Sequence, residues 1–513
     1  MFVVNSEQMR RTEENIVKNF GVTLSDLMEE VGKALAEEVL NIVGDRGNVL
    51  IVSGKGNNGG DGFVAARILS QKGFKVTVFS LADEGEIKRE AKDAFLELKR
   101  FVTPKILTTD NLKEFKAALL EVDVVVDAIF GIGFKGKIEG FVEKIVREIN
   151  SANLKVVSAD IPSGVEADSG QVHGVCIKAI KTVTFIAPKI GLFMYPGAEY
   201  VGELKVANLG LSPEVLKDGL AQTFLSDDIK NIIPVPLGDV HKKARGKVLV
   251  IAGSRGMTGA AALTARSALR AGAGLVVLGV PKSLNGILEQ KLTEVMTLPL
   301  VETETGSLDL GAYDEIIEAS KSFDVVALGP GLSQNERTIS LVQKLIADID
   351  CPLVLDADGL NAVVGKTHLL AKRLRSTVIT PHPGELARLF EITAEEIQKD
   401  RLGFAKRAVS EWKVGVVLKG AYSIVGVNDD FSINTTGNWG MATAGTGDVL
   451  TGFISSFIAQ GLDSFEAAVL GTYFHGLAGD FAADDVTRYC LIAGDLIDYL
   501  PKAIKNTLER GSR

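Results

Sequence analysis

The stretch NVLIVSGKGNNGGDG, residues 48–62, leads an apolar run directly into a glycine-rich turn. Asn48 to Ser53 is predicted to be a strand buried on both faces, and a helix is predicted from Phe63 onward. Five glycines between residues 54 and 62 allow the backbone to approach a ligand closely. A buried strand, a glycine-rich turn and a helix form the repeating unit of an α/β fold with a parallel sheet.

The same alternation recurs along the chain in two separate series. The first follows two periodic helical stretches, about residues 5–19 and 24–42, and the second begins near residue 246. Further strands are predicted at Lys75–Ser80, Val122–Phe130, Lys155–Ala159, Thr182–Ala187, Lys247–Ala252, Leu275–Val280, Asp324–Leu328, Pro352–Leu355, Thr377–Ile379 and Val414–Leu418. The polar segment from Leu211 to about Ser226 does not show the alternation of strands and helices of either series. We therefore expect two tandem α/β domains, 1–212 and 226–513, joined by a linker at 213–225.

Composition excludes several classes of protein. With 513 residues, 46% of them apolar and 24% charged, the chain is typical of globular proteins with more than one domain. The net charge of −9 argues against a general nucleic-acid or anionic-membrane surface. Three widely spaced cysteines support neither a disulfide framework nor a thiolate metal site. No signal peptide and no run of roughly 20 apolar residues is recognised, so a cytoplasmic protein is expected.

A second glycine turn, Gly445-Thr446-Gly447-Asp448, precedes the apolar run Val449 to Ile454. The amides of such a turn and the start of the following helix can hold an anion such as a phosphoryl group. A carboxylate there would repel phosphate, but it can take a proton from a hydroxyl that attacks the phosphoryl group. The alternative is an ordinary helix start in which Asp448 only complements the helix dipole.

Other polar or glycine-rich loops follow the predicted strands of the second series, so a parallel sheet would gather them along one edge. They are Gly253–Ala261, Gly329–Leu332, Asp356–Asn361, Thr380–Leu386 and Lys419–Ser423. Each has a structural alternative. Asp356 and Asp358 could be turn carboxylates, His382 a buried hydrogen-bonded histidine, and Lys419 a solvated side chain at a strand end.

In the first series, two more strand ends carry carboxylates beside glycines, at Asp127–Gly133 and Ala159–Gly164. The glycine turn at 54–62 fits neither a P-loop nor the dinucleotide fingerprint. Asn58, Asp127 and Ser163 offer oxygen ligands alone, which suit a hard cation. The alternative for each carboxylate is a loop cap or turn former.

Together these three loops make residues 1–212 resemble the YjeF-type N-terminal domain, the NAD(P)H-hydrate epimerase family, which has a Rossmann-like fold. The resemblance implies that Asp160 is the acid–base residue and that Asn58, Asp127 and Ser163 hold K⁺. The residues that it implies in contact with the hydrated nucleotide are Asn57, Asn58, Gly59, Gly60, Asp61, Gly131, Ile132, Gly133, Phe134, Lys135, Gly136, Lys137 and Asp160.

Residues 225–505 resemble the ribokinase-like superfamily, and most closely its NAD(P)H-hydrate dehydratase branch. The most specific segments are His382-Pro383-Gly384-Glu385 and Asn438 to Asp448. The resemblance implies that Asp448 is the base and that Mg²⁺ accompanies ADP or ATP, between which the residues do not decide. It implies hydrate contacts at Ala260, Gly331, His382, Pro383, Gly384, Glu385, Leu386, Ala387, Arg388 and Asp448. It implies a nucleotide site of Lys419, Gly420, Ala421, Tyr422, Ser423, Asn438, Trp439, Gly440, Met441, Ala442, Thr443, Ala444, Gly445, Thr446 and Gly447.

The expected function is therefore repair of hydrated NADH and NADPH, by epimerisation and by nucleotide-dependent dehydration of the S-form. One alternative is a small-molecule kinase acting on a sugar or vitamin precursor. Another is an N-terminal module that binds nucleotide or a protein partner without catalysis. A homo-oligomer is expected, although the apolar segment Leu462 to Ala483 is better explained as a buried core helix than as an interface.

Overall fold

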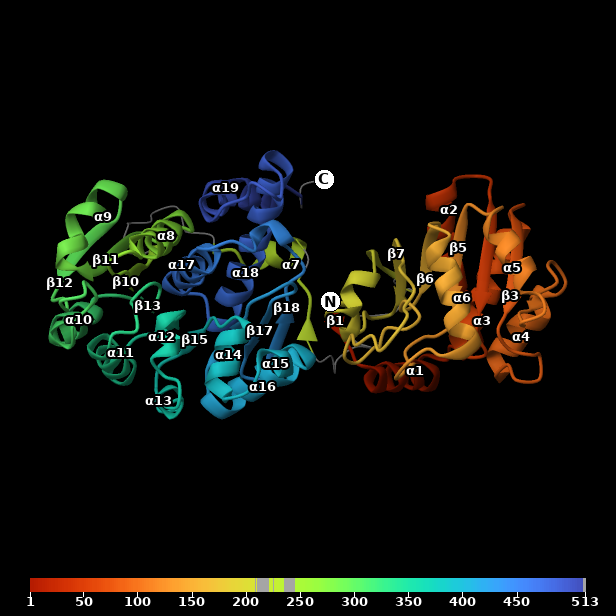
Figure 1. Ribbon diagram of the computed structural model, residues 1–513, viewed down its shortest axis with the longest axis horizontal. Coiled ribbons are helices and arrows are strands. Elements are labelled where there is room, and N and C mark those ends of the chain that lie inside the picture. Colours follow the sequence, from red (N-terminus) through yellow and green to blue (C-terminus); the bar gives the residue numbers. More distant parts are fainter. Residues whose placement is uncertain (208, 210–220, 225, 235–244, 511–513) are drawn as a thin grey trace. The chain divides into compact units, whose positions relative to one another are not determined.

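The computed structural model describes residues 1–207, 209, 221–224, 226–234 and 245–510. The chain forms two compact units, Met1–Ala221 and Gln222–Arg513, here called unit 1 and unit 2 (Figure 1). Most of the predicted linker at 213–225, and of the polar segment beginning at Leu211, lies outside the described residues. Both units are three-layer α/β structures, which confirms the predicted fold class.

Unit 1 is built on a seven-stranded parallel sheet. In spatial order its strands are β4 (Lys105–Ile106), β3 (Lys75–Ser80), β2 (Asn48–Ser53), β5 (Val124–Ala128), β6 (Lys155–Ala159), β7 (Lys181–Phe185) and β8 (Glu203–Ala207). Every strand predicted in the first series is present. The two edge strands were not predicted, because β4 has only two residues and β8 is half-exposed rather than apolar on both faces.

Helices cover both faces of this sheet. One layer holds α2 (Leu24–Val43), α3 (Asn57–Gln71) and α4 (Arg89–Leu98), and the other holds α5 (Leu112–Leu119) and α6 (Gly140–Ser151). The short β1 (Phe2–Val3) and helix α1 (Ser6–Phe20) precede them. Capping boxes begin α1 at Asn5 and α2 at Thr23, which explains why both starts were visible in the sequence.

The start of α3 corrects a prediction. The helix begins at Asn57, not Phe63, so the segment interpreted as a glycine-rich loop forms its first two turns. A Cβ at Gly62 would lie 2.6 Å from both Ser53 Oγ and Ala128 Cβ, and one at Gly60 would lie 2.5 Å from the sulfur of Met28. Gly62 therefore allows close packing of α3 on its sheet, and Gly60 allows close packing of α3 against α2, so neither serves loop flexibility.

Unit 2 contains a larger sheet with a parallel core. The parallel strands, in spatial order, are β12 (Met296–Leu300), β11 (Leu275–Pro281), β10 (Lys247–Ile251), β13 (Val325–Leu328), β14 (Leu353–Leu355), β15 (Thr377–Ile379) and β16 (Gly415–Leu418). An antiparallel pair, β17 (Ile424–Val427) and β18 (Asp430–Ile433), continues the sheet, and β9 (Ala221–Gln222) pairs with β18. The predicted strands are present. Missed were β12, which is half-exposed and contains Pro299, and the short hairpin of β17 and β18.

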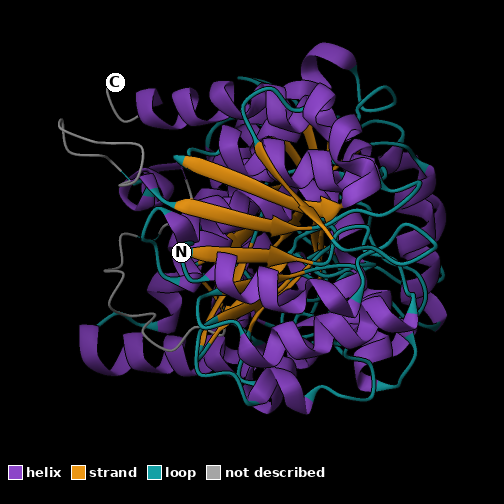
Figure 2. Ribbon diagram, turned by 90° about the vertical axis from the view of Figure 1, so that its left-hand side faces the viewer, coloured by secondary structure: helices purple, strands orange, loops and turns teal. Residues whose placement is uncertain are grey.

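Helices also cover both faces of the sheet of unit 2. In Figure 2 this unit is on the side toward the viewer. One layer holds α7 (Ser226–Ile232), α8 (Thr258–Arg270), α17 (Thr446–Ala459), α18 (Ser464–Val486) and α19 (Ala493–Arg510). The other helices are α9 (Asn285–Lys291), α10 (Tyr313–Ser320), α11 (Glu336–Asp348), α12 (Asp358–Asn361), α13 (His368–Ala371), α14 (Pro383–Phe390), α15 (Ala394–Lys399) and α16 (Arg401–Trp412). Helix α18 packs between α17 and α19 and is a core helix, as the sequence favoured. Within the described ranges, no helix has the length and apolar character needed to span a bilayer.

The strand order of each sheet reverses at one point, between β2 and β5 in unit 1 and between β10 and β13 in unit 2. Loops that leave the carboxyl ends of such neighbouring strands run in opposite directions and open a crevice between them. The glycine-rich segments follow these strands in both units. The fold therefore places a candidate site at the carboxyl edge of each sheet.

Candidate active sites

The first site is built around the start of α17 in unit 2. Gly445 precedes the helix with a left-handed backbone (φ 90°), and α17 begins at Thr446, as predicted. A Cβ at Gly445 would lie 2.6 Å from Leu263, so both conformation and space require glycine here. The amides of a first helical turn lack acceptors within the helix and carry the positive end of its dipole. The turn is therefore shaped to hold an anion, with Asp448 at the third helical position.

Asp448 is largely buried beside other charged groups. Burial raises the pKa of its carboxyl to about 7, and the negative charge of Asp356 acts in the same direction while Lys419 opposes it. A carboxyl group with such a pKa is partly ionised at neutral pH and can both accept and release a proton. The position and environment of Asp448 are therefore compatible with its predicted role as a general base.

Lys419 and Asp356 form a buried ion pair next to this turn. Lys419 Nζ lies 2.7 Å from Asp356 Oδ1 and 3.7 Å from Glu385 Oε2, and Thr451 Oγ1 donates a 2.8 Å hydrogen bond to Asp356 Oδ2. Burial disfavours the charged lysine, but Asp356 and Glu385 outweigh it and raise the pKa of Lys419. The alternative of a solvated Lys419 is wrong. Asp356, 1% exposed, is likewise no ordinary turn residue.

The His382 to Glu385 segment is the capped start of α14. His382 Nδ1 accepts hydrogen bonds from the backbone N–H groups of Gly384 (3.0 Å) and Glu385 (3.3 Å). The His382 N–H in turn donates to Glu385 Oε2 at 2.8 Å, which completes a capping box. The imidazole is half-exposed, so the alternative of a buried histidine is wrong. Because Nδ1 accepts and burial lowers the pKa of His382, the ring is neutral and carries its proton on Nε2.

The structure brings other predicted hydrate-contacting residues together. A Cβ at Gly331 would lie 3.1 Å from Ala260 Cβ, so these two loops meet at the crevice between β10 and β13. Arg388, on α14, donates to Asn361 Oδ1 at 3.0 and 3.2 Å. Asp358 accepts a 2.9 Å hydrogen bond from the Ser333 N–H. For Asp358, the structural alternative of a turn carboxylate is therefore confirmed.

The predicted nucleotide segment is anchored to α18. Asn438 Nδ2 donates at 3.0 Å to both the Gly479 carbonyl and Asp480 Oδ1. His475 Nε2 lies 2.8 Å from the Thr446 carbonyl, and burial lowers the pKa of His475 to about 4. The imidazole is therefore neutral and donates this hydrogen bond. His475 was not predicted, because it lies in the middle of an apolar helix, outside any motif.

A second unpredicted residue, Arg401, donates hydrogen bonds to the backbone at the loop Lys419 to Ser423. Its guanidinium, on α16, donates to the carbonyl oxygens of Ala421 at 2.6 Å and Leu418 at 3.3 Å. Burial lowers the pKa of Arg401 to about 10, which still leaves it charged near neutral pH. A buried cation from another element thus helps to hold the loop of the predicted nucleotide site in place.

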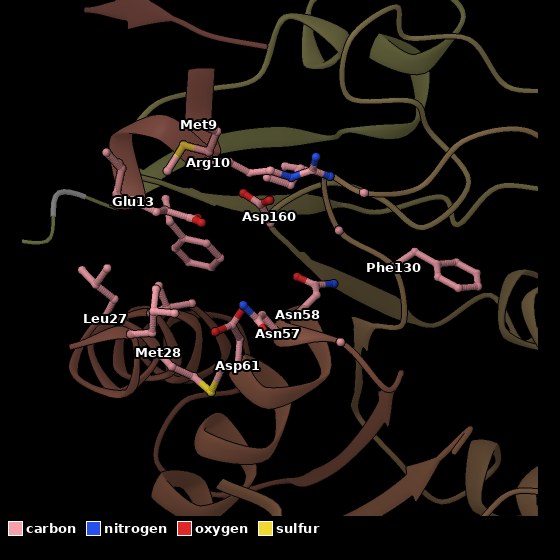
Figure 3. A pocket seen from close by; sticks show the side chains of 18 of the residues that line it. Met9, Arg10, Glu13, Leu27, Met28, Asn57, Asn58, Asp61, Phe130 and Asp160 are labelled. Carbon is pink, nitrogen blue, oxygen red and sulfur yellow. The ribbon is translucent and has the colours of Figure 1, made fainter. Parts of the chain in front are cut away.

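Unit 1 contains a cavity of about 560 Å³ at the carboxyl edge of its sheet (Figure 3). Its walls come from α1, α2, the start of α3 and the turns after β5, β6 and β7. The predicted residues that line it are Asn57, Asn58, Asp61, Gly131, Ile132, Gly133 and Asp160. Those that do not line it are Gly59, Gly60, Phe134, Lys135, Gly136 and Lys137.

The non-lining residues have other contacts. Phe134 stacks on Phe130, with 5.1 Å between ring centroids, and Lys135 Nζ lies 3.7 Å from Asp168 Oδ2. The Gly136 N–H donates to Glu166 Oε1 at 2.9 Å. Residues 134–137 continue the turn whose first residues form the cavity wall, whereas Gly59 and Gly60 belong to α3 and pack against Gly54 and Met28.

Asp160 follows β6 with a left-handed backbone (φ 65°), unusual for a residue with a side chain. Its Oδ1 accepts from Lys189 Nζ and, at 3.1 Å, from Thr184 Oγ1. Lys189 is 1% exposed and donates also to the Phe185 carbonyl at 3.2 Å. A strained backbone and a buried ion pair thus fix one carboxylate at the cavity wall. Lys189 was not predicted, since nothing in its local sequence marks it.

Two more acids face the same cavity. Burial raises the pKa of Glu13, on α1, to about 7, and the nearby Asp160 adds to this while Lys189 opposes it. Burial also raises the pKa of Asp61, on α3, well above its ordinary value, and Asp160 and Glu13 act in the same direction. Glu13 was missed because α1 carries no glycine motif.

Of the predicted cation ligands, Asp127 and Ser163 are in direct contact, and Asn58 lines the cavity. Asp127, fully buried, accepts hydrogen bonds from the Ser163 N–H at 2.9 Å, Ser163 Oγ at 2.6 Å and Ser158 Oγ at 2.9 Å. Asn58 is 9% exposed, and among the described residues neither polar atom of its side chain has a hydrogen-bond partner. Burial raises the pKa of Asp127, which a bound cation would oppose. Nowhere in the described ranges do three His, Cys, Asp or Glu side chains group as a transition-metal site requires.

Two family models match separate parts of the chain, one within each unit. The family model described as YjeF-related protein N-terminus matches residues 24–191, and that described as NAD(P)H-hydrate dehydratase matches residues 248–502. A crystal structure of ADP/ATP-dependent NAD(P)H-hydrate dehydratase from Bacillus subtilis, co-crystallised with ATP/Mg²⁺, covers 56% of this chain and 99% of its own, with 28% identity and a TM-score of 0.48.

Full-length relatives also match. The bifunctional NAD(P)H-hydrate repair enzyme Nnr of Moorella thermoacetica is 42% identical over 99% of this chain and 98% of its own length. The protein of the same name from Thermofilum pendens is 39% identical over 98% of this chain and 96% of its own. With this identity along nearly the whole of both chains, the protein belongs to the family of bifunctional NAD(P)H-hydrate repair enzymes, Nnr.

Proposed function

We propose that the chain repairs hydrated NADH and NADPH with two activities, one in each unit. Unit 1 interconverts the R- and S-forms of the hydrate, and unit 2 dehydrates the S-form with ADP or ATP. The observation that carries the proposal is the site of unit 2, where Asp448 lies in the first turn of α17 and burial raises the pKa of its carboxyl to about 7. If unit 1 converts the R-form of the hydrate into the S-form, a dehydratase that acts only on the S-form can remove both epimers.

In unit 2 the expected chemistry begins with phosphoryl transfer. Asp448 takes the proton of the hydrate hydroxyl, and the hydroxyl oxygen attacks the terminal phosphoryl group held at the amides of Gly445 to Gly447. Phosphate then leaves as the ring double bond forms. Hydroxide is a poor leaving group near neutral pH and phosphate is a good one, so consumption of a nucleotide is justified. We assign the hydrate to the side of His382 and Gly331, and the nucleotide to the Lys419 and Asn438 segments.

In unit 1, Asp160 is assigned to acid–base catalysis at the hydrated ring. Epimerisation requires a hydroxyl to leave as water and water to return on the other face. The fixed position of Asp160, through Lys189 and its left-handed backbone, supports this role. Asn57, Asn58, Asp61 and the turn from Gly131 to Lys137 are assigned to substrate binding.

Two metal ions belong to the proposal. Asn58, Asp127 and Ser163 fit a K⁺ ion, because the buried Asn58 amide lacks a partner among the described residues and the Asp127 carboxylate is desolvated. Bound there, K⁺ would supply positive charge beside Asp127 and would be coordinated by the Asn58 amide oxygen. Mg²⁺ bound with the nucleotide supplies charge that neutralises its phosphates. A cytoplasmic location and a homo-oligomeric state are also part of the proposal.

Incubation of the protein with a mixture of NADH-hydrate epimers and ADP or ATP tests both activities. Recovery of NADH from both epimers is the expected result. A phosphorylated sugar or vitamin precursor without NADH formation would favour the kinase, and consumption of one epimer alone would favour a non-catalytic unit 1.

Asp448→Ala separates the two sites. We expect dehydration to fall at least about 10²-fold while epimerisation proceeds at the wild-type rate. Normal dehydration by this variant would remove Asp448 from the mechanism. Asp463→Ala, which changes an exposed helix cap in the same unit, serves as the matched control.

A further inference from the structure

The cavity of unit 1 holds more acid–base groups than a one-carboxylate mechanism uses. Glu13, Asp61 and Asp160 all line it, and the one buried ammonium group, that of Lys189, pairs directly with Asp160. Asn58, 9% exposed and without a side-chain partner among the described residues, lines the same space. Unpaired buried amide atoms in a cavity of this size indicate a ligand site, and the three acids line that same cavity.

The acids lie on different walls. Asp61 comes from α3, together with Asn57 and Asn58, whereas Asp160 follows β6. In Figure 3, the α3 residues lie across open space from Asp160 and Glu13. A flat ring bound between these walls would present one face to Asp61 and the other to Asp160.

The two carboxyl groups also differ in environment. Asp160 forms an ion pair with Lys189 and accepts a further hydrogen bond from Thr184 Oγ1. Burial raises the pKa of Asp61 well above its ordinary value, with Asp160 and Glu13 adding to the shift, which favours its protonated form. Two acids with such different surroundings are typical of an acid and a base that act in one reaction.

We propose that Asp61 is a second catalytic acid–base residue of the epimerase site and acts on the face of the hydrated ring opposite to Asp160. This inference rests on the proposed epimerase function and assigns Asp61 more than substrate binding. Both walls take part in the proposed reaction, because a proton donor on the face that loses the hydroxyl and a proton acceptor on the face that gains it assist the departure and return of water.

The proposed step balances as follows. Hydration of a reduced nicotinamide places the hydroxyl on the carbon next to the ring nitrogen. Asp61 gives its proton to that hydroxyl, the C–O bond breaks to release water, and the nitrogen lone pair forms a double bond to the carbon. Water adds to the other face, its proton passes to Asp160, and the lone pair returns to nitrogen. The opposite epimer follows the same path in reverse. Between turnovers in one direction, Asp160 releases its proton to solvent water and Asp61 takes one up from it.

Asp61→Asn tests the assignment. We expect kcat for epimerisation to fall about 10²- to 10⁴-fold in both directions, with KM changed less than about threefold. A rise in KM with kcat unchanged would show that Asp61 only binds substrate and would overturn the proposal. Asp93→Asn, the same exchange at an exposed position of α4, is the matched control and should keep wild-type values. If the wild-type protein does not interconvert the epimers, the proposed function itself fails.

A second measurement uses the wild-type protein and so does not depend on the folding of a variant. Two catalytic groups give a bell-shaped pH profile of kcat, because Asp160 must be ionised and Asp61 protonated. The charged groups that face Asp61 are Glu13 from α1, Asp160 after β6 and Lys189 after β7, with Arg10, Lys55 and Lys88 also lining the cavity. A profile with a single limb between pH 4 and pH 9 would overturn the proposal.

Variants assign the limbs of that profile. The residual kcat of Asp61→Asn protein should no longer fall at high pH. In Glu13→Gln protein the fall should remain but shift to lower pH, because the charge of Glu13 raises the pKa of Asp61. Loss of the high-pH limb in Glu13→Gln and its retention in Asp61→Asn would give the second role to Glu13 and overturn the assignment.

Discussion

At the scale of single residues, the environment of Asp448 predicts how dehydration depends on pH. Burial raises the pKa of this carboxyl to about 7, and a general base must be ionised to work. We therefore expect kcat/KM for the hydrate to fall about tenfold per pH unit as pH drops below about 7, and to level off above it. Initial rates of NADH formation between pH 5 and pH 9, at saturating nucleotide, measure this. A flat profile across that range would contradict the role of Asp448 as the base.

The ion pair of Lys419 and Asp356 predicts a change in stability. Lys419→Met leaves a buried Asp356 carboxylate without its cation, which costs about 3–5 kcal/mol for a buried pair. Trp412 and Trp439, the only tryptophans of the chain, both belong to unit 2, so urea unfolding followed by tryptophan fluorescence reports on this unit. Lys321→Met, which removes an exposed pair with Glu318, should unfold near the wild-type midpoint. Equal midpoints for both variants would show that the buried pair contributes nothing.

At the scale of elements, regular strands and the turn at Asp448 were predictable from the sequence. A buried parallel strand is apolar on both faces, and a glycine turn before an apolar run marks a helix start, so both signals are local. The start of α3 was not predictable in this way. Its glycines indicated a loop, but Gly62 is required by the close approach of Ser53 and Ala128 and Gly60 by that of Met28, which only the packed fold reveals.

In the candidate sites, too, some residues were predictable from local sequence and others were not. Residues within a motif, such as Asp448 and Asn58, were found because the motif itself signals a turn at a strand end. Lys189, His475 and Arg401 were missed because each acts on a site from a distant element. Their function arises from burial and from the partner that the fold supplies, and neither is encoded next to them in the sequence.

The contact between α8 and α17 predicts the effect of one methyl group. A Cβ at Gly452 would overlap Ser267 Oγ and lie 2.8 Å from the Ala268 nitrogen, so Gly452→Ala must push the helices apart. We expect a loss of about 1–3 kcal/mol, seen as a lower urea midpoint by tryptophan fluorescence. Gly494→Ala, where the new Cβ meets nothing within 4 Å, should not destabilise the unit. An unchanged midpoint for Gly452→Ala would mean that this interface yields without cost.

At the scale of the whole molecule, each unit has its own core and its own site, so the two activities should be separable and additive. With an equimolar mixture of epimers and excess ADP or ATP, the wild-type protein should consume all of the hydrate. Asp160→Asn protein should consume the S-form at the wild-type rate and then slow to the rate of spontaneous epimerisation.

Complementation between two defective proteins then tests whether the units communicate through the free hydrate. Asp448→Asn protein keeps the site of unit 1, and Asp160→Asn protein keeps that of unit 2, so a mixture of the two should recover complete conversion to NADH. The rate of the slow phase should rise in proportion to the amount of Asp448→Asn protein added, because it supplies epimerase activity in solution. Asp448→Asn/Asp160→Asn protein added in equal amount is the control and should leave the slow phase unchanged. Failure of the mixture, with both single variants folded, would mean that the hydrate must pass between sites of one molecule. Recovery would show that sharing a chain serves to supply both activities in equal number, without a requirement for direct transfer.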